Sequence, residues 1–155
     1  MTASQRLREL GIELPTVSAP LAAYVPTKRT GNLLYIAGQG PIVDGRVVMH
    51  GKLGRDLDVR QGLEAARLSA INALAAMASA VGDLDGIVQI VKLNGYVNCV
   101  DEFEDQHLVI NGASELLVEV LGERGRHARA AVGTNALPLN MPVEIELIVE
   151  VAPGR

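Results

Sequence analysis

The residues of this sequence best suited to chemistry lie near its C-terminus, in the stretch HARAAVGTNALPLNMPVEIELIVEV, residues 127–151. Arg129 brings a side chain that stays charged and binds carboxylates through two parallel hydrogen bonds. Glu144 begins a run in which glutamates alternate with apolar residues, and a glutamate is a common proton acceptor in active sites. Side chains of these two types serve to anchor a carboxylate and to move a proton.

The alternation itself has a simpler structural explanation. Apolar residues occupy the odd positions of 143–151 and glutamates most of the even ones, which predicts a strand with one buried and one wet face. The alternation alone favours glutamates that face water, and on pattern alone Arg129 is better explained as a surface arginine. Ile148 lies on the glutamate face, however, and an apolar residue there is compatible with a surface that a second copy of the chain covers.

The spacing of Arg129 and Glu144 argues against their meeting in a simple hairpin. The turn between the two segments centres near residues 139–140, so Glu144 would lie opposite a residue near 135. Arg129 is about six residues from that point, roughly 20 Å at the rise of a strand. If the two residues share a site, we expect an interface between subunits to bring them together.

Other reactive side chains give weaker signals. Cys99, His107 and His127 have no spacing typical of a metal site, so we expect no metal; Cys99 is better explained as a small buried side chain and His107 as a surface residue. Asn111 is followed by Gly112 inside a predicted helix, and both are poor helix formers. Either the helix tolerates a weak point, or a polar group there faces a cleft beside closely packed backbone.

The elements that would position these residues can be read along the chain. We expect an N-terminal arm over residues 1–20, containing a short helix at 4–11, and a single domain over 21–155. Asp58 with Gln61 forms a capping box that starts a helix, and Gly82 ends it; Asp101 with Glu104 suggests a second start, and Gly122 a second end. Asp44-Gly45 predicts a hairpin turn. The predicted strands are 22–28, 33–37, 42–48 (as a hairpin), 87–98, 127–134 and 143–151, with helices at 59–81 and 102–121. This order predicts an α+β fold with two helices on one face of a sheet.

Composition excludes several classes of protein. The chain has 155 residues, 48% hydrophobic, a net charge of −4, one cysteine and no tryptophan. Nucleic-acid binding is not expected without a dense basic surface and stacking aromatics. A single cysteine suits a reducing compartment, and neither a leader-like nor a membrane-spanning apolar run is evident. We therefore predict a cytoplasmic protein that binds neither membrane nor nucleic acid.

The C-terminal stretch resembles the signature of the RidA (YjgF/YER057c/UK114) family: an arginine, a short apolar strand, Leu-Pro, and then Val-Glu-Ile-Glu. These are Arg129, Leu137-Pro138 and residues 143–146 here. Further landmarks follow in order over roughly residues 20–151: Tyr24 after the arm, the family's strand-ending Gly-Gln-x-Pro at 38–41, and Asn111 inside the second helix.

The resemblance implies a chorismate-mutase-like fold and a homotrimer whose sheets form a central barrel, with three clefts between subunits. It implies hydrolysis of reactive enamine and imine intermediates, such as 2-aminoacrylate and 2-iminopropionate, to 2-keto acids and ammonia, with no cofactor or metal. Arg129 would bind the carboxylate of the ligand and Glu144 would position the water. Tyr24, Gly38, Asn111 and Ala131 would line the pocket.

The sequence departs from the family pattern at two positions of that pocket. Many members have cysteine where this chain has Ala131, and serine where it has Ala37. If the backbone at position 131 is what matters, alanine is harmless; if a thiol is needed, activity is lost. A trimer that binds a small carboxylate metabolite without turnover is therefore an alternative. Ribonuclease activity, a label that the family has carried, suits the acidic charge poorly.

Overall fold

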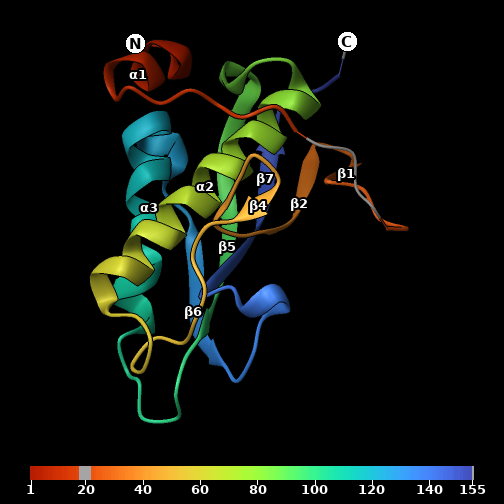
Figure 1. The fold of residues 1–155 in the computed structure, drawn as a ribbon. Coiled ribbons are helices and arrows are strands. Elements are labelled where there is room, and N and C mark those ends of the chain that lie inside the picture. The colour runs from red at the N-terminus through yellow and green to blue at the C-terminus, as the bar shows by residue number, and fades with distance from the viewer. Residues whose placement is uncertain (18–21, 155) are drawn as a thin grey trace.

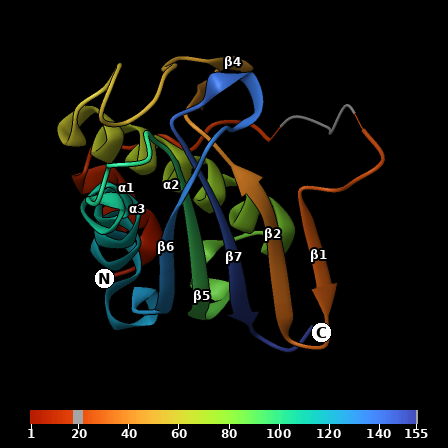
Figure 2. The same ribbon diagram turned by 90° about the horizontal axis from the view of Figure 1, so that it is seen from below.

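The computed structural model describes residues 1–17 and 22–154, and one five-stranded sheet organises them (Figure 1). Its strand order is β1-β2-β7-β5-β6, and only the β5–β6 pair is parallel. The strands of the sheet are β1 (Thr27–Thr30), β2 (Leu33–Gln39), β5 (Ile87–Asn98), β6 (Ala128–Thr134) and β7 (Val143–Val151). The two long helices, α2 (Val59–Val81) and α3 (Gln106–Leu121), pack on one face of this sheet, as the sequence predicted (Figure 2).

Helix α2 has the bounds that its capping signals predict. The Asp58 side chain accepts a hydrogen bond from the Gln61 backbone, and the Gln61 side chain accepts one from the Asp58 backbone. Gly82 ends the helix with a φ of 84°, a conformation that favours glycine. The face that meets the sheet is rich in alanine, which allows the helix to approach the strands closely.

Helix α3 begins later than the sequence predicted. The expected start at Asp101 is wrong, because the chain stays extended after β5: Cys99 forms a bridge with Leu53, and the Val100 backbone N–H donates to the Leu53 carbonyl. Residues 101–102 form a turn, and Asp105 precedes the helix without a side-chain cap. The predicted end at Gly122 is confirmed.

The backbones of the two long helices are in close contact at Gly112. A Cβ added there would lie 2.1 Å from the Leu63 carbonyl oxygen of α2, so no side chain fits. This explains the glycine inside an otherwise apolar helix. It also means that the weak helix former beside Asn111 has a packing role.

The connection from β2 to α2 contains the predicted hairpin. Strands β3 (Ile42–Val43) and β4 (Arg46–Val47) form a separate two-stranded sheet. Asp44 and Gly45 between them have φ values of 51° and 75°. Two successive residues of positive φ suit the right-handed twist of the paired strands, which is why Asp-Gly is favoured at such turns.

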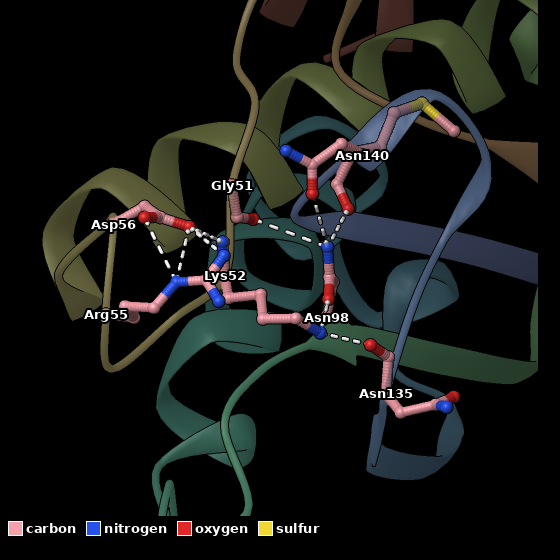
Figure 3. A network of polar contacts seen from close by, with 8 residues as sticks. Gly51, Lys52, Arg55, Asp56, Asn98, Asn135 and Asn140 are labelled. Carbon is pink, nitrogen blue, oxygen red and sulfur yellow. Dashed lines mark hydrogen bonds and ion pairs between the residues drawn. The ribbon is translucent and has the colours of Figure 1, made fainter.

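A polar network at the end of β5 holds together the loop before α2 and the turn before β7 (Figure 3). The buried Asn98 amide donates to the Met141 carbonyl (3.1 Å) and the Asn140 side chain (3.3 Å). Its oxygen accepts from the Lys52 ammonium (2.9 Å), which also donates to the Asn135 carbonyl. Asn98 thereby ties the loop before α2 to the turn that leads into β7.

The N-terminal helix α1 (Ala3–Glu9) packs against α3. Ala3 and Leu7 are buried in the main core, and the Arg6 guanidinium donates to the Glu119 carbonyl of α3. The predicted first strand at 22–28 is observed as β1, shifted to Thr27–Thr30. The end of the expected arm, residues 18–20, lies outside the described residues. None of the described helices is long and apolar enough to cross a membrane.

Candidate functional site

Arg129 lies on β6, the edge strand of the sheet, and points toward α3. Its Nη1 donates to the Asn111 side-chain oxygen (2.8 Å) and to the Ser114 hydroxyl (3.2 Å), and its Nη2 donates to the His107 carbonyl (3.3 Å). The side chain is half-buried, and none of the ion pairs within residues 1–17 and 22–154 includes it. The structure therefore holds a cation in place without neutralising it.

The partners of Arg129 leave one edge of its guanidinium free. Both Nη1 hydrogens are used, and one Nη2 hydrogen is used. Nε has no acceptor within the described residues, and Nη2 has only the His107 carbonyl there; Nε and Nη2 lie side by side on one edge of the guanidinium. Two parallel N–H groups match the two oxygens of a carboxylate.

Asn111 serves this arginine. Its amide oxygen accepts a hydrogen bond from Arg129, and Gly112 beside it packs against the α2 backbone. Ala131, two residues beyond Arg129 on β6, points to the same side and packs against the core opposite Gly95.

Two further side chains join this cluster that sequence reasoning did not place there. The Ser114 hydroxyl lies 2.9 Å from Nε2 of His127, and Nδ1 of His127 lies 2.6 Å from the Gly125 carbonyl oxygen. Burial lowers the pKa of the His127 imidazole, and the nearby Arg129 lowers that pKa further. The available signals were the spacing of Ser114 three residues after Asn111 on a helix, and of His127 two residues before Arg129.

Glu144 lies on the opposite face of the sheet. In the register of β5, Arg129 pairs with the buried Leu93 on the helix side, whereas Glu144 on β7 pairs with Tyr96 on the other side. Gly38 of β2 is next to Glu144, because an added Cβ there would lie 2.6 Å from the carboxylate oxygen Oε1. Gly38 thus leaves room for this carboxylate.

The neighbouring residues raise the proton affinity of Glu144. Burial raises the pKa of its carboxyl, and the charge of Glu146 raises it further. Glu146 itself accepts hydrogen bonds from Tyr96 (2.7 Å) and Asn94 (3.2 Å), whereas the Glu144 carboxylate has no such partner within the described part of the chain. An unpaired, partly buried carboxylate with a raised pKa is a better proton acceptor than an ordinary surface carboxylate.

The structure therefore places the predicted site residues in two groups, which we call candidate half-sites. One consists of Arg129 with Asn111 and Ala131, and the other of Glu144 with Gly38. Strands β6 and β7 form no hairpin in this sheet, since β5 lies between them. The two half-sites stay apart in one chain, because they lie on opposite faces of the sheet. Tyr24 precedes β1 and is 61% exposed.

The raised pKa of Glu144 predicts a stability effect. The folded chain binds the carboxyl proton more tightly than the unfolded chain does, so this group's contribution to stability falls as the pH rises from about 4.5 through the folded-state pKa. Glu144→Gln removes that loss. We expect the variant to gain on the order of 0.5 kcal/mol at pH 7 and nothing at pH 4.

Urea denaturation at both pH values, at one fixed protein concentration, measures this difference. Glu115→Gln, which removes an exposed glutamate of α3, controls for the loss of one negative charge. If the Glu144→Gln variant is less stable than the parent at pH 7, burial does not destabilise the charged form of Glu144.

The described residues contain no group of three or more His, Cys, Asp or Glu side chains arranged to hold a metal ion. Cys99 is buried, as the sequence indicated, and His107 is exposed on α3.

Comparison with known proteins gives consistent matches over nearly the whole chain. Residues 4–151 match the family model described as "YjgF/chorismate mutase-like, putative endoribonuclease". Protein TCP17 of Trypanosoma cruzi is 44% identical over 145 residues, which are 93% of this chain and 91% of that protein.

Solved structures agree in fold. The protein Atu1372 of Agrobacterium tumefaciens, described as of unknown function, is 51% identical with a TM-score of 0.89, covering 97% of this chain and 92% of that one. A protein of Shewanella oneidensis with the same endoribonuclease designation is 37% identical with a TM-score of 0.94, covering 97% of this chain and all of that one.

Proposed function

Because the chain belongs to the YjgF/chorismate-mutase-like family, we propose that it hydrolyses reactive imines of small 2-amino acids to 2-keto acids and ammonia. The observation that carries the proposal is the half-buried Arg129, held by Asn111 with one edge of its guanidinium free. The substrates are 2-iminopropionate and its relatives, which form from enamines such as 2-aminoacrylate. No metal or cofactor takes part.

Arg129 would anchor the substrate by its carboxylate. The free Nε–H and Nη2–H edge binds both carboxylate oxygens and fixes the direction in which the imine carbon points. An imine is already reactive toward water, so correct placement of the water supplies much of the rate enhancement.

Glu144 would handle the proton. Its carboxylate accepts a proton from the water that adds to the imine carbon, and it returns a proton to the nitrogen. The same carboxylate then takes the hydroxyl proton of the resulting carbinolamine and passes it to the nitrogen, so that the C–N bond breaks, the carbonyl forms, and ammonia leaves. A pKa raised by burial keeps the carboxyl able to act in both directions.

A complete site requires a second copy of the chain, since Arg129 and Glu144 lie on opposite faces of one sheet. We propose a cyclic homotrimer in which the sheets form a central barrel and each cleft combines Arg129 of one subunit with Gly38 and Glu144 of the next. Tyr35 and Val132 support this arrangement: they lie on the face of the sheet away from the helices and are 43% and 46% exposed. Tyr24, exposed just before β1, would line the cleft.

The alanines at positions 131 and 37 limit what the site does. Ala131 offers only its backbone, so no thiol takes part in the proposed reaction. If the cleft bound a keto acid without turnover, the chain would be a carboxylate-binding trimer, and this is the second candidate. The free edge of Arg129 favours carboxylate binding in either case.

An imine-trapping assay tests the proposal. An amino-acid oxidase generates 2-iminopropionate from alanine, and semicarbazide traps the imine that remains. We expect the protein to reduce the trapped imine and to speed pyruvate release. If it does neither, but pyruvate raises its melting temperature, the protein is the binder; if pyruvate has no effect either, the site assignment is wrong.

Gly38→Ala tests the second half-site. The added Cβ would lie 2.6 Å from Oε1 of Glu144 and must displace that carboxylate. We expect kcat to fall about thirtyfold, because the water loses its base. In a Glu144→Ala background, where no carboxylate remains to displace, Gly38→Ala should cost little more. Equal losses in both backgrounds would show that Gly38 acts independently of Glu144.

A further inference from the structure

A chain of hydrogen bonds runs from Arg129 away from the proposed ligand. Arg129 Nη1 contacts the Ser114 hydroxyl (3.2 Å), the hydroxyl contacts Nε2 of His127 (2.9 Å), and Nδ1 of His127 contacts the Gly125 carbonyl oxygen (2.6 Å). Arg129 belongs to β6 and Ser114 to α3. The Gly125 carbonyl and His127 lie on the segment that connects α3 to β6. They join the arginine to the core of the fold.

The direction of every bond in this chain is fixed at its two ends. A carbonyl oxygen only accepts, so Nδ1 of His127 carries the proton that it donates to Gly125. Nε2 of the neutral ring is then an acceptor, and the single Ser114 proton points to it. The Ser114 oxygen is left with lone pairs to accept from Arg129, which at the other end only donates.

The environment of His127 favours the neutral ring that this order requires. Burial lowers the pKa of the imidazole; the hydrogen bond to the Gly125 carbonyl opposes this with a smaller rise, and Arg129, two residues further along the chain, lowers the pKa too. Ser114 from α3 and the Gly125 carbonyl from the preceding turn are uncharged partners. A protonated ring would turn Nε2 into a donor, and the Ser114 oxygen would then face two cationic donors.

We infer that Ser114 and His127 are positioning residues that hold the Arg129 guanidinium in the orientation that presents its Nε–Nη2 edge to a carboxylate. This inference rests on the proposed function of Arg129 as the carboxylate anchor. Asn111 alone fixes one Nη1 hydrogen; the hydroxyl fixes the second, and the imidazole fixes the hydroxyl. The ligand class that the arrangement selects is a small carboxylate bound from the side of the guanidinium.

Kinetics of imine hydrolysis test the inference with Ser114→Ala and His127→Ala. A looser anchor weakens substrate and transition state alike, so we expect KM to rise about tenfold while kcat changes less than about threefold. His127→Gln restores a neutral acceptor near the Nε2 position. It should recover most of the affinity, and its KM should lack the rise that protonation of His127 causes in the parent as the pH falls. His50→Gln, at an exposed histidine bonded to the Leu139 carbonyl, is the matched control.

The inference is overturned if both alanine variants keep the parent KM, or if they lower kcat and leave KM unchanged. Nitrogen-15 NMR of the imidazole separates its failure from failure of the proposed function. Wild-type His127 should carry its proton on Nδ1 at pH 7 whether or not the protein turns over an imine. A ring protonated on Nε2 would overturn the hydrogen-bond order, whereas the expected tautomer in a protein that neither hydrolyses 2-iminopropionate nor binds pyruvate would instead refute the proposed function.

Discussion

Arg129→Lys is expected to lower kcat/KM for imine hydrolysis by about thirtyfold or more, and Arg129→Ala by about a thousandfold. Two charge-assisted hydrogen bonds contribute about 1.5–3 kcal/mol each, and every 1.4 kcal/mol is a factor of ten. Lysine keeps the charge, but it cannot present two parallel N–H groups, nor can it satisfy Asn111 and Ser114 while it holds a ligand.

The imine-trapping assay measures this loss. In both Arg129 variants the factor by which KM rises should exceed the factor by which kcat falls. Arg126→Lys is the matched control, because that arginine is exposed and pairs only with Glu123 at the surface. The folded protein should lose little stability in either Arg129 variant, since the side chain is only half-buried. Retention of full activity by Arg129→Lys would show that the site needs a positive charge and not a fork of donors.

Gly112→Ala is expected to have the largest effect on stability, a loss of about 3 kcal/mol or more. Alanine is the better helix former by about 1 kcal/mol, so helix propensity alone predicts a gain. The new Cβ would instead lie 2.1 Å from the Leu63 carbonyl oxygen and 2.9 Å from its carbon, and backbone atoms of α2 cannot move aside as a flexible side chain does. The helices must separate.

Urea denaturation measures the effect, with Gly86→Ala as the control. A Cβ at Gly86 meets only Val81 at 3.8 Å, an ordinary contact, and no positive φ is involved. That variant should stay within about 0.5 kcal/mol of the parent. A Gly112→Ala protein as stable as the parent would mean that α2 and α3 are not in backbone contact at this position.

The sequence predicted those elements whose ends have local signals. Helix α2 begins at a capping box and ends at a glycine of positive φ, and β7 has strict alternation, so their bounds were predictable. The start of α3 was not, because the bridge from Cys99 to Leu53 overrides the capping pattern at Asp101. That bridge joins residues far apart in sequence and has no local signature.

The resemblance selected the residues of the candidate site one by one, and their spacing already argued against a meeting of Arg129 and Glu144 in one hairpin. Spacing did not supply the strand order, although a helix between strands 87–98 and 127–134 favours a parallel crossover of those two strands, which leaves β5 between β6 and β7. That crossover carries α3 over β6 and brings Ser114 to His127 and Asn111 to Arg129. The cluster follows from tertiary packing, which spacing along the chain does not encode.

Subunit mixing tests most directly the claim that Arg129 and Glu144 act together from different copies of the chain. Arg129→Ala and Glu144→Gln proteins, each nearly inactive alone, are unfolded together in equal amounts and refolded. In randomly assembled trimers about a quarter of the clefts combine an intact Arg129 with an intact Glu144, so we expect about a quarter of wild-type imine hydrolysis to return. Activity no greater than that of the two variants refolded separately and then combined would contradict a site shared between subunits.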